Sequence, residues 1–451
     1  MFVSCFDPRD FGAIADGRTK DTVAVQAAID AAASHGGTVR LAGGIFVCGT
    51  LYLKSNVALE ITNSATLLAS PDIADYGTDT HHNRYRNEPE LDRCFLFAQD
   101  AENVTICGSG VIDGNAAAFP NAGSIYRPML LRVLRCRNVR VTGLRLLNAA
   151  AWTTAFLDSN FLWATDLHIE NYRNYNGDGL DFDGCRHVWV RGCYIDGTDD
   201  NLCLQSSGLP VQDVHISDCA FTSVCAGIRI GLKSIGEISG VVISNCTMRN
   251  VWREGIKLEC TEGGSITDIL VENVTMHNVR RPIFAILNNR YCPDDLGSSV
   301  ELDHIPPIGT MARLRFVGIT AVDDEEMAHA QRRFDNDIMG EPKFGGCRFD
   351  ANAAYPIQDV TIRDFSYTAI GGVRLADLPA APYPEVPDLL QDPAAPGSEN
   401  YYPDGSRTTH LDVRNVQGLV LEKLCFTTLH PDERPQILTE CAFENLSAEM
   451  Q

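Results

Sequence analysis

Gly179-Leu180-Asp181-Phe182 is the first of four stretches that share one pattern; the others are Asn201-Leu202-Cys203-Leu204, Gly227-Ile228-Arg229-Ile230 and Gly255-Ile256-Lys257-Leu258. In each stretch the second and fourth residues are apolar, whereas the first and third are not. This alternation indicates a strand with one buried face. The four stretches begin 22, 26 and 28 residues apart. The spacing predicts one strand per repeat rather than an array of hairpins.

A second series of apolar residues repeats through the same part of the chain. Its steps are 23, 26, 26, 27 and 28 residues, and its members are Val141, Ala164, Val190, Ile216, Ile243 and Val271. Fixed periods of this length indicate a solenoid. Because the period inside each unit is 2 rather than 3.6, helical solenoids are excluded. The sequence therefore predicts an all-β fold, a right-handed parallel β-helix.

The N-terminal part of the chain adds one helix. An alanine-rich stretch, Val23 to Ala33, follows Asp21-Thr22 and precedes Gly36-Gly37, so that it has an N-cap signal and a C-terminal stop. We expect this helix to cap the open end of the solenoid core, which would otherwise expose apolar surface. An ordinary αβ unit is the alternative that this region leaves open.

The length of 451 residues would suggest two or three domains, but the core of a solenoid grows along its axis. We therefore predict a single β-helix domain over residues 1–451. Its expected parts are an N-terminal cap with the first coils (1–70), regular coils with the functional site (101–285), an insertion (286–357), a long loop (374–408), and a last coil with a tail (409–451).

Charge and hydropathy limit the partners. The chain has 37 basic and 59 acidic residues and a formal net charge of −22. This balance argues against nucleic acid, which needs a basic surface, and it disfavours a long polyanionic substrate unless charges cluster locally. No run of 18 apolar residues is present, so we expect no membrane span.

The 16 cysteines are scattered singly, without a CxxC or a Cys/His metal-ligand spacing. Several lie on strand-like segments, where a free cysteine behaves as a small core hydrophobe. No basic segment followed by an apolar stretch opens the sequence. These features predict a cytoplasmic protein, or an extracellular one if a leader has been trimmed from the sequence.

Carboxylates gather just before the first two strands of the repeat. Asp178 precedes the first strand, and Asp199-Asp200 precedes the second. Because stacked coils lie about 4.8 Å apart, we expect these carboxylates to be neighbours that shift one another's pKa values. Glycoside hydrolysis needs one protonated acid for the leaving oxygen and another carboxylate to activate water. The plainer alternative is that these residues only fill turns.

If the apolar residues of the strands point inward, the residues between them form outward columns. The columns are Asp181, Cys203, Arg229 and Lys257; Asp183, Gln205, Gly231 and Glu259; and, at the turn edge, Asp178, Asp200, Ala226 and Glu254. We expect the substrate-binding residues to be Asn176, Asp181, Arg229, Glu254, Lys257, Glu259 and Arg290. Arg290 belongs to the segment 288–295, for which a place beside the substrate and one on the surface of an insertion are both open.

Several motifs occur in the order typical of one family. Asn176-Gly177-Asp178 and Asp199-Asp200 are 21 residues apart, counted from Asp178 to Asp199. Upstream motifs that other pectin-degrading β-helices share are Asp16-Gly17, Asp21-Thr22, Leu51 to Val57, Gly108 to Gly114, Arg127-Pro128, Leu147-Asn148 and Trp152-Thr153. With these motifs, most of residues 8–280 resembles glycoside hydrolase family 28, the polygalacturonase-like enzymes with a pectin-lyase-like β-helix.

The resemblance implies that a glycosidic bond is hydrolysed with inversion of configuration. It implies Asp199 as the general acid, and Asp178 and Asp200 as the pair of bases that hold the water. It implies an oligosaccharide as the partner, and no metal and no other cofactor. The oligomeric state is left open.

Two departures from the family motifs bear on the substrate. The family's Gly-His-Gly falls at Cys225-Ala226-Gly227, and its Arg-Ile-Lys falls at Lys257-Leu258-Glu259. In the family these basic residues bind the galacturonate carboxylate. Lysine in place of arginine loses a bidentate fork, and Glu259 would repel an anion. Arg229, in the column of Lys257, could supply part of the lost charge; a different uronide or a neutral sugar is the alternative.

The leading hypothesis is an inverting glycosidase that is exo-acting on short uronic-acid-containing or related oligosaccharides. A second hypothesis is another reaction on the same fold, by a polysaccharide lyase or a fructosyl-transferring enzyme. A third is a non-catalytic, tailspike-like binding protein.

Overall fold

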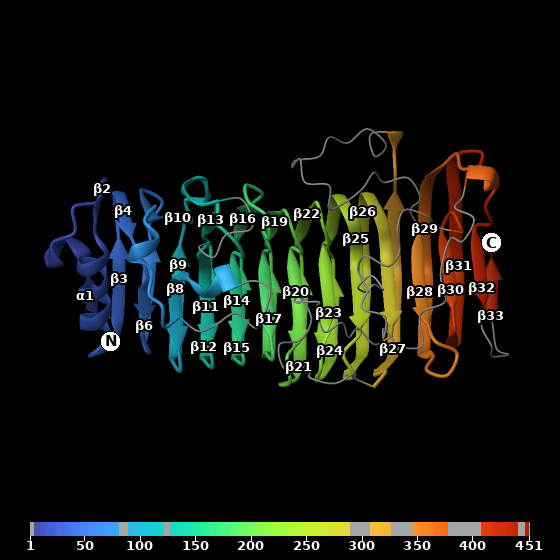
Figure 1. The fold of residues 1–451 in the computed structure, drawn as a ribbon, viewed down its shortest axis with the longest axis horizontal. Coiled ribbons are helices and arrows are strands. Elements are labelled where there is room, and N and C mark those ends of the chain that lie inside the picture. Colours follow the sequence, from blue (N-terminus) through green and yellow to red (C-terminus); the bar gives the residue numbers. More distant parts are fainter. Residues whose placement is uncertain are drawn as a thin grey trace. The chain divides into compact units, whose positions relative to one another are not determined.

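The computed structural model describes residues 4–80, 89–120, 127–288, 307–325, 346–377, 407–440 and 447–450. These residues form two compact units, one up to Asp199 and one from Asp200 onward. Each unit consists of parallel strands stacked coil upon coil (Figure 1). The predicted fold class, a right-handed parallel β-helix, is confirmed. The single domain over residues 1–451 stays a prediction.

The first unit has three ladders of parallel strands. The β12 ladder consists of β1 (Ser4–Phe6), β3 (Gly37–Leu41), β6 (Val57–Ile61), β9 (Glu102–Gly108), β12 (Arg137–Thr142), β15 (Asn160–Thr165) and β18 (Arg186–Arg191). The β16 ladder consists of β2 (Asp16–Lys20), β4 (Gly44–Cys48), β7 (Ala65–Ala69), β10 (Val111–Asp113), β13 (Arg145–Leu147), β16 (His168–Asn171) and β19 (Tyr194–Gly197). The β17 ladder consists of β5 (Leu51–Leu53), β8 (Cys94–Gln99), β11 (Met129–Leu134), β14 (Thr154–Leu157) and β17 (Leu180–Asp183).

The second unit repeats this plan with longer strands that bend from one ladder into the next. Its first ladder runs through β21 (Val211–Ser217), β24 (Glu237–Ser244), β26 (Ser265–Leu287), β27 (Thr310–Val322), β29 (Ile357–Gly371), β31 (Val416–His430) and β33 (Ser447–Met450). Another begins with β22 (Ala220–Ser223) and β25 (Thr247–Cys260). The β20 ladder joins β20 (Leu202–Ser206), β23 (Ile228–Ser234), the ends of β25 and β26, β28 (Cys347–Ala351), β30 (Leu411–Arg414) and β32 (Ile437–Glu440).

The predicted helix is present as α1 (Thr22–Ala33), which packs against β1, β3 and β5. Asp21 occupies the N-cap position, but its carboxylate makes no capping bond to the helix. It accepts hydrogen bonds from the backbone N–H groups of Ile14 (2.7 Å) and Ala15 (3.0 Å) instead. The Asp-Thr signal therefore located the helix correctly, while the aspartate side chain fastens the preceding loop. Short 3-10 helices are Pro8–Phe11, Ile73–Asp75, Pro89–Asp92, Ala116–Ala118 and Leu375–Asp377.

Inward side chains of equivalent coils stack in line and form the core. In the first unit the rings of Phe156 and Phe182 are parallel, 4.9 Å apart. In the second unit Leu202, Ile228 and Ile256 occupy equivalent positions, and all three are fully buried. The alternation seen in the four short stretches thus gives the correct inward register in each unit.

Two predicted segment boundaries differ from the structure. The range 286–357 was expected to be an insertion, but it contains β27 and β28, which continue the ladders. The range 409–451 was expected to hold one last coil, but β30 and β32, like β31 and β33, occupy two successive levels. The repeat was hidden because chain of variable length separates these strands. Apart from its first four and last two residues, the predicted loop 374–408 lies outside the described residues.

The cysteines of the described residues are free thiols, and most are buried, as predicted. Burial raises the pKa of the Cys94 thiol to about 12, so that it stays protonated in the core. No helix in the described part of the chain is long and apolar enough to cross a bilayer.

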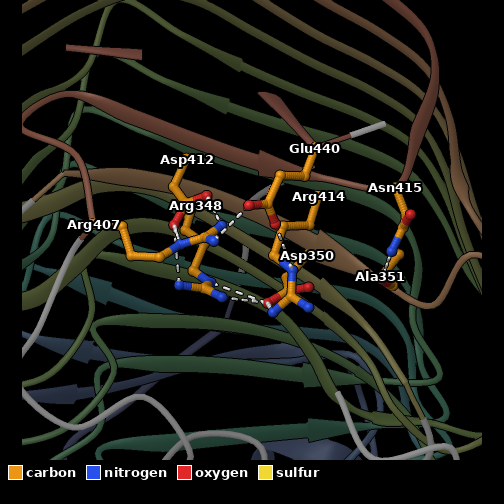
Figure 2. Close-up of polar contacts among 8 residues, drawn as sticks. All are labelled: Arg348, Asp350, Ala351, Arg407, Asp412, Arg414, Asn415 and Glu440. Atoms are coloured by element: carbon orange, nitrogen blue, oxygen red, sulfur yellow. Dashed lines mark hydrogen bonds and ion pairs between the residues drawn. The ribbon is translucent and has the colours of Figure 1, made fainter. Parts of the chain in front are cut away.

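A network of alternating charges joins the last strands of the β20 ladder, as Figure 2 shows. Arg348 contacts Asp350 at 2.5 Å and Asp412 at 3.4 Å. Arg407 contacts Asp412 at 2.9 Å and Glu440 at 2.8 Å. The side chains of Asp350 and Asp412 are almost fully buried, whereas Glu440 is half exposed at 49%. The network therefore joins β28 and β30 through buried charges that water screens little, and it reaches β32 through the half-exposed Glu440.

We predict that Ile228→Ala lowers the free energy of unfolding of the second unit by about 2–5 kcal/mol, because it opens a cavity in the stacked core. Chemical denaturation measures the change. The control is Leu209→Ala, which shortens a side chain that is 53% exposed and should change stability by less than about 0.5 kcal/mol. An unchanged stability of Ile228→Ala would mean that the inward register is wrong.

We also predict that Asp412→Asn destabilises the second unit by about 3–5 kcal/mol, because it leaves the buried guanidinium of Arg348 and that of Arg407 without their shared carboxylate. Glu440→Gln removes a half-exposed member of the same network and should cost less than about 1 kcal/mol. Equal effects of the two substitutions in denaturant titrations would argue against a role for burial in the network.

Candidate active site

In the first unit, the segment between β16 and β17 carries Asn176 and Asp178. Asn176 has a left-handed backbone (φ 55°), a conformation that asparagine tolerates better than most residues. Its side-chain oxygen accepts a hydrogen bond from Nη2 of Arg127 (2.7 Å), and Nη1 of Arg127 donates to the carbonyl of Tyr175 (2.5 Å). Arg127 is completely buried. This arginine therefore fixes the loop that leads into Asp178.

Thr198 holds the same loop from the other side. Its hydroxyl donates to the carbonyl of Asn174 (2.6 Å) and accepts from the N–H of Gly177 (2.9 Å). A Cβ on Gly177 would collide with the carbonyl oxygen of Asn171 and the hydroxyl of Thr198, so only glycine fits between Asn176 and Asp178. The middle residue of the Asn-Gly-Asp motif is thus set by packing.

Asp178 and Asp181 are both buried in the first unit, at 2% and 3% exposure. The carbonyl of Asp178 accepts from the N–H of Thr153 (2.9 Å), and the N–H of Asp181 donates to the hydroxyl of Thr154 (3.3 Å). Two threonines at the start of β14 therefore fix the position of the strand that follows Asp178. Asp199 is half-buried and is the last residue of this unit.

Asp200 opens the second unit and is fully buried. Its carboxylate contacts Nη1 of Arg229 at 2.9 Å and accepts from the backbone N–H of Ala226 at 3.2 Å. The thiol of Cys203 lies 3.7 Å from the same carboxylate. The contacts with Arg229 and Ala226 therefore hold the carboxylate of Asp200 in a fixed position.

Strand register confirms most of the predicted columns in this unit. Cys203 pairs with Arg229, Arg229 with Lys257, and Gly231 with Glu259. The pairing of β20 with β23 shifts after Leu204, so the expected alignment of Gln205 with Gly231 is not among the paired positions. The columns were expected on an outward face, yet Lys257 and Glu259 are fully buried. Neighbouring charged side chains, such as Lys257 and Glu259, shield one another from solvent.

Lys257 lies between two glutamates. Its Nζ is 3.3 Å from Glu259 and 3.8 Å from Glu254. Glu254 also contacts Nη1 of Arg281 at 3.1 Å and Nε of Arg253 at 3.5 Å. Burial by itself raises the pKa of Glu254, but Lys257, Arg253, Arg281 and Arg280 outweigh burial and hold that pKa below its ordinary value. Glu254 is therefore ionised and neutralises part of the cation cluster.

The cations outnumber the carboxylates in this region. Burial, together with Arg281 and Arg253, lowers the pKa of Arg280 to about 10, in spite of the opposing effect of Glu254. Among the described residues, the cluster holds five cations against three carboxylates; its members are Arg229, Arg253, Lys257, Arg280, Arg281, Asp200, Glu254 and Glu259. Cations that gather in this way are suited to an anionic ligand.

The predicted site residues fall on both sides of the division between the units. Asn176, Asp178, Asp181 and Asp199 belong to the first unit, and Asp200, Arg229, Glu254, Lys257 and Glu259 belong to the second. The predicted approach of Asp178 and Asp199 to Asp200 stays a prediction. Arg290 lies outside the described residues.

Sequence reasoning missed the residues that position the site and part of its charge. Arg127 was noted only as half of an Arg-Pro motif, and Thr198 was not considered. The doublet Arg280-Arg281 follows the last of the four short stretches by one coil, since Glu254 pairs with Arg281 in the strand register. Extending the turn-edge column that ends at Glu254 by one more period would have identified this doublet.

Comparison with known proteins identifies a family and several sequence relatives. The family described as glycosyl hydrolases family 28 matches residues 49–305. A probable polygalacturonase from Vitis vinifera is 27% identical over 51% of this chain and 52% of its own. An exo-poly-alpha-D-galacturonosidase from Dickeya chrysanthemi is 25% identical over 43% of this chain and 40% of its own. The chain thus spans about half the length, or less, of these two relatives.

A solved structure supports the fold. The hyperthermoactive exopolygalacturonase from Thermotoga maritima has a TM-score of 0.64 and 21% identity, over 81% of this chain and 87% of its own. At this identity the likeness concerns the fold alone. Since the family match covers more than half of the sequence, the protein belongs to glycosyl hydrolases family 28.

Proposed function

We propose that the protein is an inverting glycoside hydrolase that is exo-acting on short oligosaccharides containing uronic acid. The observation that carries the substrate class is the buried cluster around Glu254, in which five cations face three carboxylates. The positive potential of these clustered cations would attract a uronate carboxylate, whereas a neutral sugar would gain nothing from it. The name of the Dickeya chrysanthemi relative, an exo-poly-alpha-D-galacturonosidase, supports exo-action on a galacturonide.

The proposed chemistry assigns one role to each aspartate. Asp199, the half-buried one, donates its proton to the glycosidic oxygen, and the bond from that oxygen to the anomeric carbon breaks. A water held by Asp178 and Asp200 attacks the anomeric carbon from the opposite face and loses a proton to this pair. Inversion follows, because the water and the leaving oxygen occupy opposite faces of the sugar. The contact of Asp200 with Arg229 supports this assignment only by fixing the position of the carboxylate.

The contacts of Lys257 change the expected effect of the altered family motifs on substrate binding. Glu259 pairs with Lys257 and does not stand as an isolated anion, so its repulsion of a substrate carboxylate is reduced. Arg229 contacts Asp200, and Arg281 likewise contacts Glu254. We assign the role of the missing basic residues to Arg280 and Arg281, because they add two cations one coil beyond Lys257 and help to hold the pKa of Glu254 below its ordinary value.

We predict that Asp199→Asn lowers kcat by at least about 100-fold, because an amide cannot act as the general acid. A panel of oligosaccharides, galacturonides included, is incubated with each protein and the products are followed by mass. The control is Asp218→Asn, an exposed turn residue, which should keep full activity. Full activity of folded Asp199→Asn would refute the role, and products absorbing in the ultraviolet or cyclised products would indicate a lyase or a fructosyl-transferring enzyme.

We further predict that Arg280→Gln lowers kcat/KM for a galacturonide by about 10- to 100-fold, the usual value of a hydrogen bond to a charged group. The same substitution should leave kcat/KM for the matching neutral galactoside nearly unchanged. Arg249→Gln removes an exposed arginine of β25 and is the control. Equal losses on the charged and the neutral substrate would show that Arg280 acts only through the fold.

A further inference from the structure

One face of the first unit is rich in exposed arginine, although the protein as a whole is acidic. Its three neighbouring strands, β12, β15 and β18, contain no aspartate or glutamate. They carry four exposed arginines, Arg137, Arg140, Arg186 and Arg191, in a chain with 59 acidic and only 37 basic residues. We call the outward side of these three strands the basic–aromatic face. It belongs to the β12 ladder, whereas the proposed catalytic residue Asp178 leads into the β17 ladder.

Aromatic rings lie between these arginines in register. Arg140 pairs with Trp163, and Trp163 with Trp189. The two indole rings are stacked, with centroids 5.0 Å apart, and the guanidinium of Arg140 lies 3.7 Å from the centroid of Trp163. Cation–π contact holds the guanidinium against the ring and leaves the charge at the surface. The stacked rings of Trp163 and Trp189 thus restrict the position of the exposed guanidinium of Arg140.

A row of left-handed residues, one from each coil, runs along the edge of this face, and the residue type in this row changes. Asn56, Asn103 and Asn138 all have positive φ, and their side chains form a hydrogen-bonded ladder with N···O distances of 2.8 and 2.5 Å. The next two left-handed positions are Phe161 (φ 58°) and His187 (φ 54°), whose rings stack at 4.6 Å. A left-handed backbone costs phenylalanine more than asparagine.

The guanidinium of Arg137 lies 4.1 Å from the centroid of Phe161. Phe161 therefore occupies a position where the backbone favours asparagine. Its ring makes Arg137 the second arginine of this face that lies against an aromatic side chain. Backbone strain that the fold does not require indicates a functional constraint. Together with the absence of acidic residues, it marks this face as a binding surface.

We propose that the basic–aromatic face binds an anionic polysaccharide, a chain of uronic acid units lying along the ladder axis. Arg137 and Arg186 are two coils apart, since each pairs with Asn160 of β15. Neighbouring strands repeat at about 4.8 Å, so an extended polymer that runs along the ladder can contact the arginines of both β12 and β18. Each guanidinium matches a carboxylate, and several weak contacts add up along one chain. The choice of a polyuronate rests on the proposed function. Nucleic acid is a denser polyanion, and the net charge of −22 opposes it more strongly.

The test is electrophoresis of the intact protein through native gels that contain polygalacturonate or, for comparison, a neutral dextran. We expect retardation by polygalacturonate only, and weaker retardation as salt rises, because the contacts are exposed. The double variant Arg140→Gln/Arg186→Gln should raise the apparent Kd about three- to tenfold. The matched control, Arg18→Gln/Arg145→Gln, removes two exposed arginines from the β16 ladder and should bind like the wild type.

A third variant, Phe161→Asn, continues the asparagine ladder in a backbone that suits it, so folding is expected to be retained while polygalacturonate binding weakens. None of these variants should change kcat/KM on a trigalacturonide that reaches only the proposed catalytic site. The proposal is overturned if polygalacturonate does not retard the wild type, if the control double variant weakens binding equally, or if single-stranded DNA is bound more tightly than polygalacturonate. Retardation by polygalacturonate without hydrolysis of any uronide would reject the proposed function but support binding at the basic–aromatic face. Hydrolysis of a uronide without retardation would support the proposed function and reject binding at this face.

Discussion

Parallel pairing of equivalent positions in successive coils is the constraint on which the rest of each unit depends. Once Leu202, Ile228 and Ile256 align inside the second unit, the residues between them must align as well, since side chains alternate along a strand. Charges and rings that are 22 to 28 residues apart in the sequence then become direct neighbours. A shift by one residue would exchange the core for the charged columns.

The same constraint explains why charged residues can be buried in this protein. Each coil brings one charged position next to its counterpart on the following coil, so that a buried cation finds a carboxylate one strand away. Arg281 with Glu254 and Arg348 with Asp412 both follow this rule. In the network of Figure 2 every arginine drawn contacts at least one carboxylate. Around Glu254, three cations contact a single carboxylate; they are Arg253, Lys257 and Arg281.

Much of the fold could be predicted from the sequence because its signal is local. Alternation over four residues fixed the inward register of β17, β20, β23 and β25, and the period fixed the ladder. The continuation of the repeat through β27 and β28 could not be seen, since chain of irregular length separates these strands. The use of Asp21 by the preceding loop was equally hidden, because a hydrogen bond to Ile14 and Ala15 leaves no pattern in the sequence.

The aspartate motifs were recognisable because their spacing follows the coil, whereas the supporting residues come from distant parts of the chain. Arg127 reaches Asn176 across 49 residues, and no local pattern connects the two. The excess of cations around Glu254 depends on burial, which composition alone does not reveal. The sequence thus identified the candidate catalytic residues, and the structure added the residues that position them and the cations that lie around Glu254.

The measurement that tests the account most directly is the anomeric configuration of the first product, followed by proton NMR as the wild-type protein cleaves a short galacturonide. The account assigns Asp178 and Asp200 to an attacking water, so it predicts that the product first appears with the anomeric configuration opposite to that of the substrate and equilibrates only later. A product that first appears with the configuration of the substrate would mean that a carboxylate attacks the sugar itself, and the assigned roles of the three aspartates would be wrong.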